Sequence, residues 1–181
     1  HNDDQWEPKT VNPDLMDYPA QGDGYVTVIQ TDKPEFQWSD ATLNFKRPDK
    51  NNLVIYEAWV YDHTVTRDIQ GMTDRMFYYE DMGVNAIELM PIQEFDGNKN
   101  WGYSPNHYFA LDKAYGTPEQ MKTFIDECHK RGIAVIVDMV FNHATGNCSH
   151  EKLYGGYNNL KDNPYFNVSA PHGASVFEDW N

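Results

Sequence analysis

Residues 133–143 read IAVIVDMVFNH and place a carboxylate at the end of the most apolar stretch of the chain. Five apolar residues precede Asp138, and Asn142 and His143 follow where the stretch ends. A buried carboxylate without a partner is costly, so we expect Asp138 to be paired, hydrogen-bonded or placed for chemistry. A structural carboxylate, satisfied by a neighbouring arginine or a backbone amide, is the alternative, and the spacing alone favours neither.

A second polar segment, NWGYSPNHYFALDKAYGT (100–117), combines aromatic rings with an amide and an imidazole. Its rings are Trp101, Tyr103, Tyr108 and Phe109, and its polar groups are Asn106 and His107. Sugars present apolar C–H faces and a ring of hydroxyls, so this combination suits a carbohydrate ligand. Tyr103, between Gly102 and Ser104, is the better candidate for a ring that faces a ligand. We expect Tyr108 and Phe109 to pack the loop down.

Three apolar segments indicate the strands that position these groups. LVIYEAWVY (53–61) and NAIELMPI (85–92) are rich in β-branched, aromatic or aliphatic residues, and 133–143 is the third. A long loop, residues 93–116, follows the second strand. Because side chains alternate along a strand, Asp138 shares a face with Ile136 near the end of the third strand.

Two helices are expected between these strands. The spacing of methionine and tyrosine predicts a helix over residues 72–82, with Gly83 as its C-terminal cap. The second helix starts after Thr117, whose hydroxyl can form a capping box with Gln120, and it ends at Gly132.

The order β-α-β-α-β, with apolar strands, predicts an α/β fold with a parallel sheet covered by helices. An open doubly wound sheet and a (β/α)8 barrel both fit. Neither G-x-G-x-x-G nor a P-loop follows a strand, and the long insertion after the second strand favours the barrel. In both architectures the functional groups gather at the C-terminal ends of the strands.

Composition limits the possible partners. The 181 residues include 28 acidic and 14 basic side chains, and the net charge of −14 argues against nucleic acid and anionic membranes. No apolar run approaches the roughly 18 residues of a membrane span. The chain does not begin with Met, so the lack of a visible signal peptide says nothing about export. Cys128 is expected to be a buried apolar residue on a helix.

Several of these segments together resemble one family. VDMVFNH resembles the first signature of the α-amylase-type glycoside hydrolases (family 13), a D-x-x-x-N-H at the end of the third barrel strand. GVNAIELMPIQEF, NWGYSPNHYFALDKAYGT and IDECHKRGIAVIVDMV resemble the same family in the same order. The resemblance covers roughly residues 53–146 and is strongest to bacterial α-amylases, pullulanases and branching enzymes.

The resemblance implies a role for four residues. Asp138 would be a structural acid beneath the site, His143 would hydrogen-bond the sugar where cleavage occurs, and Tyr103 would stack against that sugar. Asn142 would hold the loop after the third strand and, in calcium-binding members, ligate the ion through its side-chain oxygen. No cofactor is required, and calcium is the one ion that the family suggests.

The resemblance also implies what the chain lacks. Such enzymes are retaining and use a carboxylate nucleophile and a general acid, which in this family follow the fourth and fifth strands. Glu57 and Glu88 lie within the first two strands, so they are not assigned as this pair. We therefore expect the first three β/α units of a (β/α)8 barrel (53–181), ending in the loop after strand three and inactive alone. Residues 1–52 would be an extended connecting segment from an upstream, starch-binding domain.

The expected function of the parent protein is hydrolysis of α-glucosidic bonds in starch- or glycogen-like polysaccharides. A branching enzyme or other transglycosylase, and a non-catalytic glucan-binding barrel, are the alternatives. The fragment is expected to self-associate through its uncovered sheet. We expect a bacterial protein that is secreted, periplasmic or on the cell surface rather than cytoplasmic.

Overall fold

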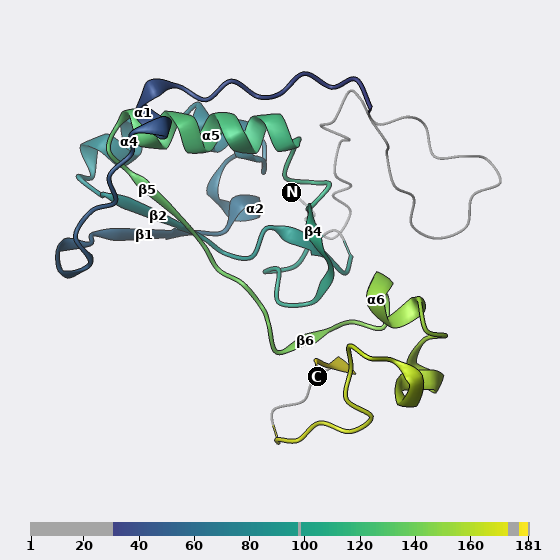
Figure 1. The fold of residues 1–181 in the computed structure, drawn as a ribbon. Coiled ribbons are helices and arrows are strands. Elements are labelled where there is room, and N and C mark those ends of the chain that lie inside the picture. Colours follow the sequence, from purple (N-terminus) through teal and green to yellow (C-terminus); the bar gives the residue numbers. More distant parts are fainter. Residues whose placement is uncertain (1–30, 98, 174–177, 181) are drawn as a thin grey trace.

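A computed structural model describes residues 31–97, 99–173 and 178–180 of the chain. Its centre is a parallel sheet of three short strands, β1 (Ile55–Ala58), β2 (Ala86–Leu89) and β5 (Ala134–Val137), in the order β1-β2-β5 (Figure 1). The three predicted strands are therefore confirmed, in a common direction. The register places Glu57 opposite Glu88, and Glu88 opposite Ile136.

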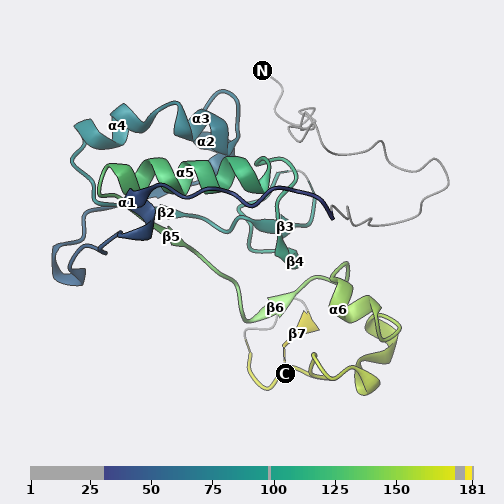
Figure 2. The same cartoon turned by 45° about the horizontal axis from the view of Figure 1, so that its top comes forward.

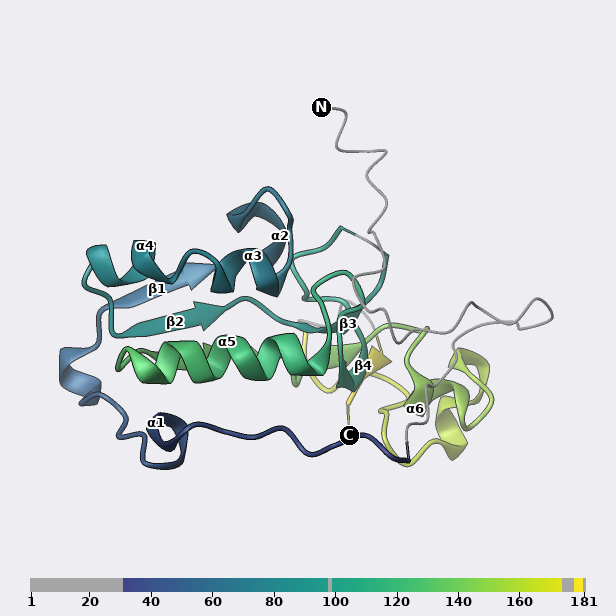
Figure 3. The ribbon, with the colours of Figure 1, turned by 90° about the horizontal axis from the view of Figure 1, so that it is seen from above.

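One face of this sheet is covered by helices. The helices α3 (Ile69–Thr73), α4 (Met76–Asp81) and α5 (Pro118–Lys130) lie on the same side of the strands (Figures 2 and 3). The apolar core between these two layers includes Met72, Tyr79, Ile87, Leu89 and Phe124, each fully buried. On the opposite face the described residues form no such layer, and Ile55 and Glu57 of β1 are exposed.

The long helix α5 begins and ends as its sequence predicts. The Thr117 hydroxyl accepts from the Gln120 amide at 3.1 Å, and the Gln120 side chain accepts from the Thr117 amide at 2.8 Å. Gly132 follows the helix with φ of 72°, a conformation that glycine adopts without strain. Cys128 is fully buried on its inner face, as predicted.

Several predicted boundaries are wrong. The strands expected over 85–92 and 133–143 end early, at Leu89 and Val137. The strand expected over 53–61 ends at Ala58, because the Trp59 carbonyl accepts from the amides of the next turn, and α2 (Val60–His63) begins there.

The helix expected over 72–82 is two helices, α3 and α4. The Asp68 side chain caps the Gly71 amide at 2.7 Å and starts α3 early, and the helix breaks at Arg75, whose guanidinium donates to the His63 carbonyl at 3.0 Å. Gly83 ends α4 at φ of 68°, as expected.

The segment predicted as a loop over 93–116 contains an antiparallel hairpin. Its strands are β3 (Gln93–Phe95) and β4 (Pro105–Leu111), and their register shifts twice. The irregular pairing removes the strict alternation by which a strand is found in a sequence.

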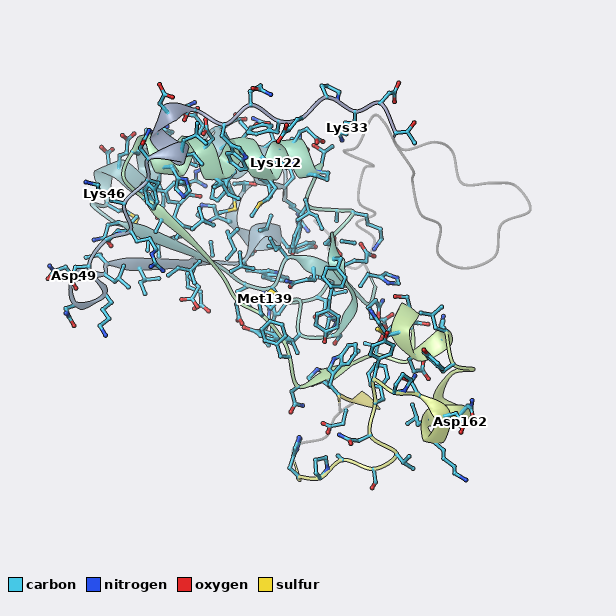
Figure 4. The ribbon with its side chains drawn as sticks, viewed as in Figure 1. Lys33, Lys46, Asp49, Lys122, Met139 and Asp162 are labelled. Atoms are coloured by element: carbon cyan, nitrogen blue, oxygen red, sulfur yellow. The ribbon has the colours of Figure 1, made fainter. Side chains whose placement is uncertain are left out.

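Residues 33–46, here called the strap, lie along the outer face of α5 (Figure 1). The strap includes the short helix α1 (Asp40–Leu43), and the 3₁₀ helix η2 (Lys50–Asn52) leads from it towards β1. Lys33 forms an ion pair with Glu119 at 2.7 Å, and Lys122 lies over the Phe36 ring at 5.8 Å (Figure 4). The part of the predicted connecting segment before residue 31 lies outside the described residues, and its upstream domain stays a prediction.

After β5 the chain leaves the sheet and forms a small separate unit (Figures 1 and 2). This unit, residues 143–173 and 178–180, is here called the satellite. It contains β6 (His143–Ala144), α6 (Ser149–Lys152), the 3₁₀ helix η3 (Tyr157–Asp162) and β7 (Glu178–Asp179), and β6 pairs with β7 in an antiparallel manner. Its own core consists of Ala144, Cys148, Leu160 and Phe166. None of the helices in the described part of the chain has the length and hydrophobicity needed to cross a bilayer.

Candidate active site

Asp138 lies directly after β5, at the C-terminal end of the sheet. Its amide donates to the Leu89 carbonyl at 2.9 Å, which continues the pairing with β2 by one residue. Its carboxylate accepts a hydrogen bond of 2.6 Å from the Tyr103 hydroxyl. The expectation of a hydrogen-bonded carboxylate is thus met, but Asp138 is half-buried and not fully buried. Its sheet face carries no helical layer among the described residues, which explains the remaining exposure.

His143 joins the same group of residues through Tyr103. Its Nε2 lies 2.8 Å from the Tyr103 carbonyl oxygen, and its Nδ1 lies 3.1 Å from the side-chain nitrogen of Asn142. A carbonyl only accepts and an amide nitrogen only donates, so these neighbours select the neutral tautomer with hydrogen on Nε2. Asp138, Asn142 and His143, expected at the C-terminal end of the third strand, lie there, and Tyr103 contacts both Asp138 and His143.

The loop that carries Tyr103 is held tightly against the end of β2. Gly102 has φ of 94°, and a Cβ atom on it would lie 2.4 Å from the Pro91 carbonyl oxygen. The Asn100 side chain accepts from the Gly102 amide at 2.9 Å, and the Asn100 carbonyl accepts from the Trp59 indole at 3.0 Å. Glycine is therefore required at position 102. The loop presents Tyr103 towards Asp138, and the Tyr103 side chain is 38% exposed.

The electrostatics of the site come from its carboxylates. The hydrogen bond to Asp138 raises the pKa of Tyr103 to about 12, and partial burial and the charges of Asp138, Glu57 and Glu88 act in the same direction. Tyr103 is therefore a neutral hydrogen-bond donor at neutral pH. Glu57 and Glu88 lie opposite each other in the register of β1 and β2, within the sheet.

The predicted calcium ligand, Asn142, is exposed beside His143. Its side-chain nitrogen is directed at the imidazole, and its backbone carbonyl accepts from the Trp180 amide at 3.2 Å. No group of three or more acidic, histidine or cysteine side chains that could hold a metal occurs in the described ranges. A single amide oxygen is less than the six to eight oxygen ligands that calcium takes, so no step of the chemistry is assigned to calcium.

The two aromatic residues expected to pack the loop differ from each other. Tyr108 does pack, because its ring is half-buried, but its hydroxyl also donates to the His143 carbonyl at 2.6 Å. Phe109 is 96% exposed, so its predicted packing role is wrong. The sequence reasoning missed the link of Tyr108 to His143 and that of Trp180 to Tyr108. The residues are 35 and 72 positions apart, and no local pattern connects them.

This arrangement defines the class of the protein. A parallel sheet with helices outside it, and a polar site at the C-terminal ends of its strands, is consistent with part of a (β/α)8 barrel. Residues 36–178 match the family described as the alpha-amylase catalytic domain. The chain belongs to this family, which confirms the resemblance of its motifs.

Curated relatives agree with this assignment. The chain is 39% identical over 121 residues to malto-oligosyltrehalose trehalohydrolase from Saccharolobus solfataricus. This match covers 66% of this chain and 20% of the relative. It is 30% identical over 167 residues to the enzyme of that name from Arthrobacter ramosus, and this match covers 83% of this chain and 29% of the relative. It is 37% identical over 124 residues to a 1,4-alpha-glucan branching enzyme from Xanthomonas oryzae pv. oryzae, and this match covers 64% of this chain and 17% of the relative. The chain thus spans less than a third of the length of these relatives.

Solved structures show the same architecture. A trehalose-6-phosphate hydrolase from Bacillus licheniformis superposes with a TM-score of 0.54 at 30% identity, over 68% of this chain and 23% of that one. An alpha-amylase from Lactobacillus plantarum superposes with a TM-score of 0.60 at 22% identity, over 72% of this chain and 31% of that one, a likeness that concerns the fold alone.

Proposed function

We propose that the protein carrying this chain is a retaining enzyme that hydrolyses α-glucosidic bonds in starch- or glycogen-like polysaccharides. The observation that carries this proposal is the contact of Tyr103 with both Asp138 and His143 at the C-terminal end of the sheet. A partly exposed ring beside a carboxylate and an imidazole can stack on the C–H face of a glucose unit and hydrogen-bond its hydroxyls. Family membership supports the same substrate class.

In this proposal the chain supplies sugar binding. Retaining hydrolysis needs two carboxyl groups about 5–5.5 Å apart, one as nucleophile and one as general acid. The carboxylate of Asp138 is engaged by Tyr103, and Glu57 and Glu88 lie within the sheet, so these three are not assigned as the reacting pair. The reacting carboxylates would come from later strands of the barrel, in keeping with the small share of each relative that this chain covers.

The test uses the whole protein with starch, glycogen and malto-oligosaccharides as substrates. We expect new reducing ends whose anomeric configuration, followed by proton NMR, is retained. The variant His143→Ala should lower kcat/KM by about 10- to 100-fold, because it removes a group that contacts the sugar. Turnover of none of these glucans, or inversion at the anomeric carbon, would overturn the proposal.

A branching enzyme is the second candidate, because a relative 37% identical to this chain has that name. Both reactions pass through a glycosyl-enzyme intermediate and differ in the acceptor, which is water or another glucan. Debranching the product of a linear glucan with an isoamylase separates the two. New short chains without a gain in reducing ends would indicate branching, and binding without any turnover would indicate a glucan-binding barrel.

We also propose that the chain 1–181, when isolated, self-associates through its sheet. In the described residues β1 and β5 are the outer strands, each with one unpaired edge. Val54, Ile55 and Val137 are 52%, 45% and 36% exposed. Unpaired edges and exposed apolar side chains favour association. Light scattering after size exclusion should show oligomers, and a monomer at all concentrations would contradict this.

A further inference from the structure

The short strand that carries His143 is held from two sides. On one side β6 pairs with β7, with His143 opposite Asp179, and the Trp180 amide donates to the Asn142 carbonyl at 3.2 Å. On the other side the Thr145 amide donates to the Pro105 carbonyl at 3.1 Å. The site histidine therefore lies at the edge of the satellite that meets the hairpin, and its position depends on both β7 and β4.

One phenol connects these two sides. The Tyr108 hydroxyl donates to the His143 carbonyl at 2.6 Å and accepts from the Trp180 indole nitrogen at 2.8 Å. The rings of Tyr108 and Trp180 meet edge to face, with centroids 5.2 Å apart. A hydroxyl has one hydrogen to donate and lone pairs to accept, so both bonds form at once, and the indole sets the direction of the O–H group.

The indole is itself held in place. Its ring stacks on Phe166 with centroids 4.4 Å apart, and the His150 ring meets it at 5.5 Å. Phe166 is buried in the core of the satellite. Burial also raises the pKa of Tyr108 to about 12, so its hydroxyl keeps its proton throughout the neutral range.

We propose that Tyr108, aligned by Trp180, is a positioning residue for His143. The hydrogen bond to the His143 carbonyl fixes the backbone of β6, so that Nε2 reaches the Tyr103 carbonyl and Nδ1 faces Asn142. The satellite thereby sets the tautomer and direction of an imidazole in the site. This inference rests on the proposed role of His143 in sugar binding.

The test compares Tyr108→Phe and Trp180→Phe in the whole protein, because each keeps an aromatic ring and removes one hydrogen bond. The first readout is kcat/KM for maltoheptaose, which should fall by about tenfold in Tyr108→Phe. The second is the ¹⁵N spectrum of histidine-labelled protein, with the His143 signal identified by its loss in His143→Gln. The wild type should show one Nε2–H tautomer, and both variants should show a mixture.

Tyr165→Phe is the matched control, since Tyr165 packs against the same indole, at 6.3 Å, and is 40% exposed. It should leave both readouts unchanged. The double variant should be no worse than Tyr108→Phe, because both substitutions act through one hydroxyl.

An unchanged tautomer in Tyr108→Phe, or equal effects in Tyr165→Phe, would overturn the proposal. If both test variants fail to fold by circular dichroism, the pair is a folding element and the positioning role is rejected. If the wild type turns over no glucan, the proposed function fails, and the tautomer spectrum still decides the role of Tyr108.

Discussion

Replacing Asp126 by asparagine would release the strap from α5. Asp126 is 6% exposed on the outer face of this helix. Its Oδ1 accepts from the Ser39 amide at 3.0 Å, the Ser39 hydroxyl at 2.7 Å and the Thr42 hydroxyl at 2.7 Å. Its Oδ2 pairs with Lys130 at 3.0 Å. One carboxylate thus holds the strap at two residues, and asparagine keeps its shape without its charge.

The expected loss follows from these bonds. A net hydrogen bond contributes about 1 kcal/mol, and somewhat more to a charged acceptor, so the three bonds to Oδ1 contribute about 3 kcal/mol. An amide oxygen in Asp126→Asn can keep about one of them. We therefore expect the strap to open about 2 kcal/mol more easily, which corresponds to about 30-fold faster hydrogen exchange.

Hydrogen exchange followed by mass spectrometry measures this opening directly, at the amides of residues 36–46. The pH dependence supplies an internal check. Burial alone would raise the pKa of Asp126, but hydrogen bonds from Thr42, Ser39 and Lys130 outweigh it and hold the pKa well below its usual range. A depressed pKa stabilises the fold above about pH 4, and this contribution is lost as the pH falls further. The difference between wild type and variant should shrink over that acidic range.

Glu127→Gln is the matched control on the same helix. Glu127 pairs with Lys130 at 2.7 Å and with Arg131 at 2.6 Å, and its side chain is 27% exposed. Exposed pairs contribute about 0–1 kcal/mol, so exchange in the strap should hardly change. Equal exchange in Asp126→Asn and Glu127→Gln would refute the reasoning, because the strap would then be held by contacts other than this carboxylate.

Three further changes test the site and its support. Tyr103→Phe keeps the ring and removes the bond to Asp138, so kcat/KM of the whole protein for malto-oligosaccharides should fall by about tenfold, with ring-stacking retained. Gly102→Ala should cost about 1–3 kcal/mol in urea unfolding and should also lower kcat/KM, because its Cβ would meet the Pro91 carbonyl at φ of 94°; an unchanged unfolding midpoint would contradict this. Burial, with the nearby Glu94 charge, raises the pKa of Asp112 to about 7. Such a shift stabilises the fold below about pH 4, and the contribution is lost as the pH rises from about 4 through 7, so Asp112→Asn should flatten the fall in melting temperature over that range.

Elements whose signals are local can be predicted from the sequence. The capping box of α5 involves residues three positions apart, and Gly83 and Gly132 lie two residues after the last residues of the helices that they end. Apolar runs located the three strands. Parallel strands deliver their C-terminal ends to one edge, and Asp138, His143 and Tyr103 could therefore be placed together before their contacts were known.

How those groups are held could not be predicted, because it depends on contacts between distant segments. The hydrogen bonds from Tyr103 to Asp138, from Tyr108 to His143 and from Ser39 to Asp126 join residues 35, 35 and 87 positions apart. Arg75, which precedes α4 at the helix break, likewise donates to a carbonyl twelve residues away. Caps and periodicity act over one or two turns of chain, whereas these contacts exist only once the packed core has brought distant segments together. The tautomer of His143 belongs to this second group, because Tyr103, 40 positions away, supplies one of the two neighbours that select it.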